Sequence, residues 1–110
     1  MELEKRMVGD VTVITLDGTL DSGTAKAVHE DLGLLLPGDG KVLLDLGKMS
    51  YMSSAGLRVL LLAYRRAQAT GAGLALARLP ADVRDVMTAT GFLEFFAVAE
   101  TVDEGVEALA

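Results

Sequence analysis

Hydrophobic and polar residues are interleaved at the start of the chain in a pattern typical of β-strands. Residues 11–16 interleave Val, Ile and Leu with threonines, which predicts a strand with a buried face. A weaker strand is predicted over residues 3–8. Gly9 and Asp10 separate the two stretches, and such a pair favours a tight turn. We therefore expect an N-terminal β-hairpin that ends where residues 17–21 break the pattern.

Helical spacing of apolar residues appears four times in the remaining sequence. Each stretch begins at a capping residue or at a proline suited to the first turn, and the first three end at a glycine or before a proline. The fourth follows a capping box at residues 101–104 and carries its apolar stripe on Val102, Val106 and Leu109. The other predicted helices run from Asp21 or Ser22 to Pro37, from Ser54 to Gly71, and from Pro80 to Gly91.

Three short apolar runs, at residues 42–46, 74–78 and 95–98, separate these helices and predict core strands. Residues 47–53 are expected to form a loop. The resulting order β-β-α-β-α-β-α-β-α indicates an α/β fold. Its sheet should be mixed and mostly parallel, with about five strands and about four helices. A length of 110 residues suits a single domain over residues 1–110.

Composition narrows the classes of function. The hydrophobic fraction of 51% is typical of a packed globule, and the absence of Cys excludes thiolate metal sites and cysteine nucleophiles. Ten Lys and Arg residues against 16 Asp and Glu residues give a net charge of −6, which opposes non-specific nucleic-acid binding. The first ten residues lack the apolar core of a secretory signal, and no apolar run has the length of a membrane helix. We therefore expect a cytoplasmic protein.

Catalytic motifs are not evident in the sequence. Met52 stands where a nucleophile elbow around Ser54 needs glycine, and His29 has the spacing of a surface residue on a helix. Carboxylates such as Asp45 and Asp82 lack the paired arrangement that would indicate acid/base catalysis. We therefore expect no catalytic residue, no metal and no cofactor. A small hydrolase that uses Ser54 is the weakest interpretation.

The most informative segment is Met-Ser-Tyr-Met-Ser-Ser-Ala-Gly-Leu-Arg at residues 49–58. It joins a predicted core strand to a predicted helix, and such loops present functional groups in α/β domains. Ser53 and Ser54 lie at or next to the helix N-cap. The plainest interpretation is that a serine here caps the helix and has no other role.

The same position would also stabilise a phosphate. Free N–H groups and the positive end of the helix dipole stabilise anions, and a phosphoserine carries about −1.5 to −2 charge. Arg58 lies one turn beyond Ser54, within reach of such a group, although it also has the pattern of an ordinary solvated arginine. Met49, Tyr51 and Met52 could offer apolar contacts to a partner, and we expect at least one of them in the core.

The order and spacing of several motifs resemble the STAS domain, in particular the single-domain bacterial anti-sigma factor antagonists. The resemblance covers the chain from about Val11 to Leu109 and implies the STAS fold. It is carried by Gly18-Thr-Leu-Asp21, Leu44-Asp-Leu46, Tyr51-Met-Ser-Ser-Ala-Gly-Leu57, Leu79-Pro80, Thr90-Gly-Phe92, Phe96-Ala-Val98 and Asp103-Glu-Gly-Val106.

What the resemblance implies is a switch without catalysis. In that family the unphosphorylated antagonist binds an anti-sigma factor that is also an ATP-dependent serine kinase, and this frees a sigma factor. The kinase phosphorylates a serine at the start of the second helix, the complex dissociates, and a metal-dependent serine phosphatase resets the system. The acceptor maps onto Ser54, and the loop aspartate near the same surface maps onto Asp21. The expected partner-binding residues are Asp21, Tyr51, Met52, Ser53, Ser54 and Arg58.

One departure from the family pattern leaves alternatives open. The best-known members carry Asp immediately before the acceptor, whereas this chain has Ser53. Ser54 is therefore the expected phosphorylation site, Ser53 is the alternative, and loss of the switch is a third outcome. The runner-up function is a non-switching STAS scaffold, for example an accessory to a lipid-transport ATPase. We expect no direct nucleic-acid contact, no membrane insertion, and a monomer or weak dimer.

Overall fold

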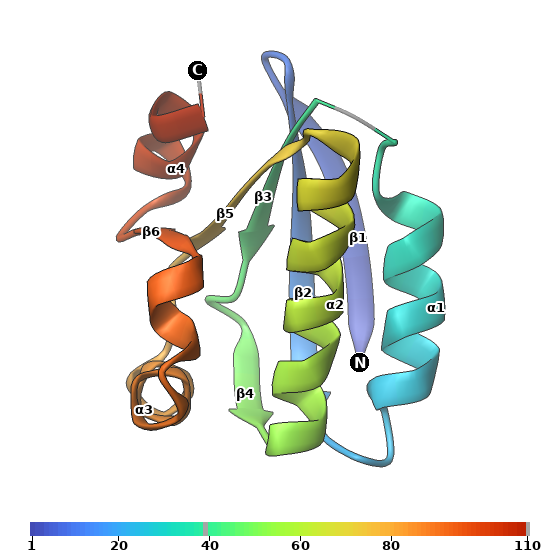
Figure 1. The fold of residues 1–110 in the computed structure, drawn as a ribbon, viewed down its shortest axis with the longest axis vertical. Helices are drawn as coiled ribbons and strands as arrows, with labels where there is room; N and C mark the ends of the chain where they lie inside the picture. Colours follow the sequence, from blue (N-terminus) through green and yellow to red (C-terminus); the bar gives the residue numbers. More distant parts are fainter. Residues whose placement is uncertain (39, 110) are drawn as a thin grey trace.

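The computed structural model describes residues 1–38 and 40–109, which form a mixed sheet with helices on both faces (Figure 1). The α-helices are α1 (Ala25–Leu35), α2 (Ser54–Thr70), α3 (Ala81–Thr90) and α4 (Val102–Leu109), and a short 3₁₀ helix spans Phe92–Phe95. The strands are β1 (Glu2–Val8), β2 (Val11–Leu20), β3 (Lys41–Asp45), β4 (Met49–Met52), β5 (Gly73–Ala77) and β6 (Ala97–Ala99).

The strands follow the spatial order β1-β2-β3-β5-β6, with β4 paired to the far end of β2. β1 and β2 are antiparallel, and the other pairs are parallel. Parallel strands need crossover connections, and the helices supply them. The predicted α/β fold, with its hairpin, mostly parallel sheet and four helices, is confirmed.

Alternating side chains along the central strands divide the core between the two faces of the sheet. Val42 and Leu44 of β3 face the larger cluster, which α1, α2 and α3 cover. Leu43 points to the opposite face and packs in a smaller cluster with Val11, Val13, Ala75 and Ala77. The stripe of Val102, Val106 and Leu109 on α4 covers this second cluster, as its spacing predicts.

Three predicted strand and loop assignments differ from the structure. Residues 47–53 are not one loop, because Met49–Met52 forms β4. β2 continues through residues 17–20, with a bulge between Gly18 and Thr19. The strand expected at 95–98 exists as β6 but begins two residues later, because the 3₁₀ helix extends to Phe95.

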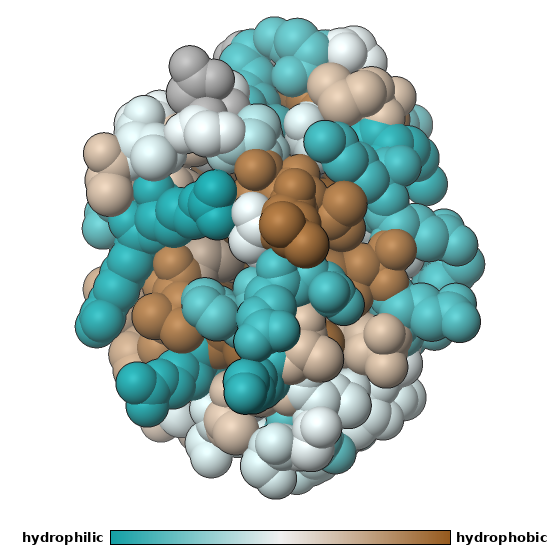
Figure 2. Space-filling model, turned by 90° about the vertical axis from the view of Figure 1, so that its right-hand side faces the viewer, coloured by the Kyte–Doolittle hydropathy of each residue, from teal (hydrophilic) through white to brown (hydrophobic). Residues whose placement is uncertain are grey.

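One side of the molecule is formed by α1 and by β1, an edge strand of the sheet. Hydrophobic side chains gather in the middle of this side, and polar side chains surround them (Figure 2). Leu34 of α1 is 85% exposed and Met7 of β1 is 58% exposed. Over the described residues, none of the helices is both long and apolar enough to cross a membrane.

Candidate functional site

The N-terminus of α2 is positioned by the pairing of β4 with the end of β2. Thr19 lies opposite Tyr51, and Leu20 lies opposite Met52. The Ser53 N–H then donates to the Leu20 carbonyl oxygen at 3.0 Å, so the chain leaves the sheet at a fixed point. Because α2 starts at the next residue, its first turn lies at the carboxyl end of a parallel strand pair, where α/β folds present functional groups.

Gly56 allows the first turn of α2 to lie directly against the backbone of β2. A Cβ atom placed on Gly56 would be only 2.3 Å from the Leu20 carbonyl oxygen and 2.8 Å from its Cγ. Such distances are far below van der Waals contact, so no larger residue fits without moving the helix. Leu57 and Leu60 follow on the buried face of α2 and fix its rotation.

The two adjacent serines have different environments. Ser53 is the N-cap of α2, with extended backbone, and its Oγ accepts a hydrogen bond from the Gly56 N–H at 3.3 Å. Ser53 is also half-buried, whereas Ser54 is exposed. Among the described residues the Ser54 hydroxyl has no protein hydrogen-bond partner. The capping role predicted for one of the serines therefore belongs to Ser53, and the Ser54 hydroxyl is open to solvent.

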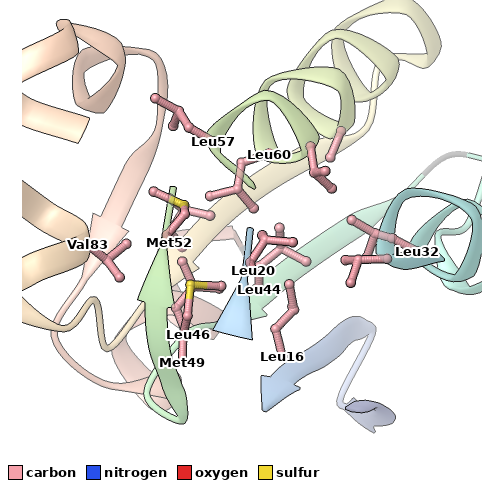
Figure 3. Packing of buried hydrophobic residues seen from close by; sticks show 14 of the residues in the cluster. Leu16, Leu20, Leu32, Leu44, Leu46, Met49, Met52, Leu57, Leu60 and Val83 are labelled. Carbon is pink, nitrogen blue, oxygen red and sulfur yellow. The ribbon is translucent and has the colours of Figure 1, made fainter. Parts of the chain in front are cut away.

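The apolar residues before the serines alternate between core and surface. Met49 and Met52 are 3% and 2% exposed, and their side chains lie among Leu46, Leu57 and Val83 (Figure 3). The prediction that at least one of the three residues Met49, Tyr51 and Met52 is in the core is confirmed. The prediction that Met52 belongs to the partner-binding surface is wrong, because its side chain is enclosed by the core.

Tyr51 points outward from the same strand and is 54% exposed. Its neighbour Ser50 is also exposed, and the Ser50 Oγ lies 3.0 Å from Thr19 Oγ1 on β2. An exposed tyrosine is common on protein-binding surfaces, because the ring offers apolar area at low entropic cost.

The loop between β2 and α1 is held by its own polar side chains. Asp21 Oδ1 accepts hydrogen bonds from the backbone N–H groups of Gly23 at 2.9 Å and Thr24 at 3.2 Å. Thr24 Oγ1 donates to the Thr19 carbonyl oxygen at 2.9 Å, which ties the loop to β2. The N-cap of α1 is Thr24 and not the predicted Asp21 or Ser22. Asp21 instead shapes the loop that leaves β2, one residue after the Leu20 that holds Ser53.

Arg58 is the cation closest to Ser54 along α2, one turn into the helix. Its side chain is exposed and forms no salt bridge with any described residue. The first turn of α2 holds no acidic residue. The N–H groups of Ser54 and Ala55 have no partner within the described chain. This end of the helix therefore has positive potential, since the free N–H groups and Arg58 add to the helix dipole.

A half-buried ion pair at the end of β3 was not predicted from the sequence. Asp45, at the end of β3, is 3% exposed, and its Oδ1 accepts from Arg78 Nε at 2.9 Å and from the Gly47 N–H at 3.1 Å. Arg78 has a φ of 58°, and its guanidinium covers Gly47. The signal in the sequence was an Asp inside an apolar run, because buried carboxylates are rare unless they are paired.

Comparisons with known proteins agree with this geometry. The family model of the STAS domain matches residues 2–105. The candidate anti-sigma factor antagonist BtrV of Bordetella bronchiseptica is 34% identical over 102 residues, covering 92% of this chain and 88% of BtrV. The chain therefore belongs to the STAS domain family. Within it, the sequence relative places the chain with the anti-sigma factor antagonists, which are regulatory proteins.

Solved structures share the fold at low sequence identity. A candidate anti-sigma factor antagonist from Thermotoga maritima has a TM-score of 0.89 at 19% identity, covering 97% of this chain and 93% of that one. The Bacillus cell fate determinant SpoIIAA in its phosphorylated form has a TM-score of 0.71 at 18% identity, covering 99% of this chain and 100% of that one. At these identities the likeness concerns the fold alone.

Proposed function

We propose that this protein is an anti-sigma factor antagonist that binds a serine-kinase anti-sigma factor when Ser54 is unmodified, and that phosphorylation of Ser54 releases that partner. Binding of the antagonist would free a sigma factor, and a serine phosphatase would return the antagonist to its binding state. The proposal combines membership of the STAS family with the position of Ser54.

The observation that carries the proposal is the difference between the two serines. A kinase must reach the hydroxyl that it modifies, and Ser54 is exposed at the first residue of α2. Ser53 is half-buried and its Oγ accepts a hydrogen bond from the Gly56 N–H, so modification of Ser53 would remove the N-cap of α2. Ser54 can gain a phosphate while the cap and the Leu20 contact of Ser53 remain in place.

The local potential would stabilise the added phosphate. The free N–H groups of Ser54 and Ala55 and the positive end of the α2 dipole act on an anion at this point. Arg58 lies on the next turn without a described ion-pair partner. Phosphorylation would therefore change the charge of the surface without unfolding the helix that carries it.

Release of the partner would follow from desolvation. Tyr51, Ser54 and Arg58 are exposed around the α2 N-terminus and would be covered in a complex. A dianion at the centre of such an interface loses its hydration, and without a cation from the partner this costs several kcal/mol. Since a micromolar complex has a binding free energy of only about −8 kcal/mol, such a penalty is enough to dissociate it.

The experiment is co-expression with a candidate serine-kinase anti-sigma factor, followed by intact mass measurement and phosphopeptide mapping. One added phosphate on Ser54 is expected in the wild type and in Ser53→Ala. Ser54→Ala should take up none. A phosphate on Ser53 would overturn the assignment of the acceptor, and the absence of any phosphate would favour the non-switching scaffold.

A further inference from the structure

The free edge of β1 is complementary to itself. β1 is the first strand in the sheet order and pairs only with β2 within the described chain. Its sequence Glu-Leu-Glu-Lys-Arg-Met-Val places charges of both signs and three apolar residues, Leu3, Met7 and Val8, on a largely exposed strand. We propose that two copies of this protein form a symmetric dimer in which their β1 strands pair antiparallel and join the two sheets.

The hairpin determines which backbone groups face the open edge. Val8 lies opposite Val11 across the two-residue loop Gly9-Asp10, with Gly9 at a φ of 60°. Residues that flank a two-residue hairpin loop form a hydrogen-bonded pair, and bonded residues alternate along the strand. The backbone groups of Leu3, Lys5 and Met7 therefore point away from β2, toward a second copy.

One register satisfies both these backbone groups and the side chains. With Lys5 at the two-fold axis, Leu3 lies opposite Met7 of the second copy, and Glu4 lies opposite Arg6 of the second copy. Symmetry makes each of these pairs occur twice, and opposite charges and apolar residues facing each other stabilise strand pairing. A slip by two residues loses this match, because it brings either Glu4 opposite Glu4 or Arg6 opposite Arg6.

The apolar pair extends a hydrophobic side that already exists. Leu3 packs against the main core and lines a groove of about 220 Å³ together with Asp31, Leu34 and Leu35. Met7 is on the same face of β1 as Leu3, since side chains two apart share a face. The hydrophobic side chains in the middle of this side of the molecule would contact those of the second copy across the two-fold axis (Figure 2).

Charged residues on an edge strand usually prevent it from pairing with other chains. A strand that pairs with β1 must therefore carry charges complementary to those of β1. Glu4 and Arg6 are both exposed and share the face opposite to Lys5. A second copy supplies the reversed order of the same charges. The two Lys5 side chains oppose each other at the axis, which makes the dimer weak. The pairing uses none of the residues around Ser54, so it stands or falls independently of the phosphorylation proposal.

The test is sedimentation equilibrium at about 0.15 M salt, where surface charges still act over several ångströms. The wild type should form a concentration-dependent dimer with a Kd below about 1 mM. Glu4→Arg and Arg6→Glu should each raise the dimer Kd about tenfold, because each creates like-charge pairs on both sides of the axis. An equimolar mixture of the two variants should regain dimers, since both arginines of one variant then face both glutamates of the other.

The control is Glu107→Arg, which makes the same charge change as Glu4→Arg at an exposed position on α4 and should leave the Kd unchanged. Circular dichroism checks that each variant is folded. A wild type that stays monomeric throughout, single variants that dimerise like the wild type, or a mixture no tighter than its components would each overturn the proposal.

Discussion

Neighbouring residues of the same type have separate tasks at the start of α2. Ser53 Oγ accepts from the Gly56 N–H, and Ser54 Oγ is exposed. A sequence cannot distinguish them, because both fit the N-cap and the choice depends on backbone dihedral angles set by β4. The same limit explains Met52: its type suits a contact surface or a core, and only the orientation of β4 decides for the core.

The different roles of Ser53 and Ser54 predict different effects of the two alanine substitutions on stability. Ser53→Ala should lower the free energy of unfolding by about 1 kcal/mol, because the Gly56 N–H loses its cap. Ser54→Ala should change it by less than about 0.5 kcal/mol, since the side chain is exposed. Urea denaturation measures both. Equal losses in the two variants would contradict the assigned cap.

Gly56 leads to a second prediction about a single residue. Gly56→Ala should destabilise the protein by about 1–3 kcal/mol, because the new methyl group collides with the Leu20 carbonyl and pushes α2 from β2. The matched control is Gly33→Ala on α1, where the added Cβ would lie 3.5 Å from Arg66 Nη1 in ordinary contact. That variant should be more stable by up to about 1 kcal/mol from helix propensity. Thermal and urea denaturation of both variants decide the sign.

Elements with a regular pattern could be predicted from the sequence, and the irregular ones could not. The stripe on α2 and the apolar run of β3 follow helical and buried-strand patterns and lie close to their predicted places. β4 was missed because it has only four residues and its buried residues, Met49 and Met52, are three apart instead of alternating. The extension of β2 was missed because the bulge at Gly18 interrupts the alternation.

The ion pair at the end of β3 supports the turn into β4. Asp45→Ala should lower the free energy of unfolding by about 2 kcal/mol, because the Gly47 N–H and Arg78 Nε both lose a charged acceptor. Asp85→Ala, at an exposed position on α3, is the control and should stay within about 0.5 kcal/mol. A loss at Asp45 no larger than at Asp85 would show that the pair does not stabilise the fold.

A second ion pair joins the hairpin turn to β3, and its contribution to stability depends on pH. Asp10 Oδ2 accepts from Lys41 Nζ at 2.8 Å, and this hydrogen bond and charge hold the pKa of Asp10 below its ordinary value. The stabilisation is present above the pKa of Asp10 in the unfolded chain, about 3.9, and is lost as the pH falls through the lower folded value. In Lys41→Gln the pKa of Asp10 should rise toward the ordinary value. An NMR titration of the Asp10 carboxyl carbon measures it, and an unchanged pKa would contradict the pairing.

At the scale of the whole molecule, the proposed switch changes the charge of one surface and leaves the fold in place. Phosphorylation of Ser54 would take the net charge from −6 to about −8 while the sheet and the cap at Ser53 keep their contacts. The sequence predicts the fold class, because the order of elements and their apolar faces agree. The sequence does not decide which of the two serine hydroxyls would accept the phosphate, because solvent exposure is a property of the folded surface.

We expect the fold of the whole molecule to remain unchanged after phosphorylation of Ser54. Amide chemical shifts of the phosphorylated protein should change around residues 51–58 and the Asp21 loop and remain constant in β3, β5 and α4. A heteronuclear NMR spectrum before and after phosphorylation measures this. Changes spread over the sheet would indicate that the phosphate acts by rearranging the fold instead of by altering its surface.

The most direct test of the switch is the affinity for the anti-sigma factor kinase, measured by calorimetry before and after phosphorylation of Ser54. We expect the unmodified protein and Ser54→Ala to bind alike, and the phosphorylated protein to bind at least about a hundredfold more weakly, as a penalty of roughly 3 kcal/mol requires. Equal affinities of the phosphorylated and unmodified proteins would contradict it.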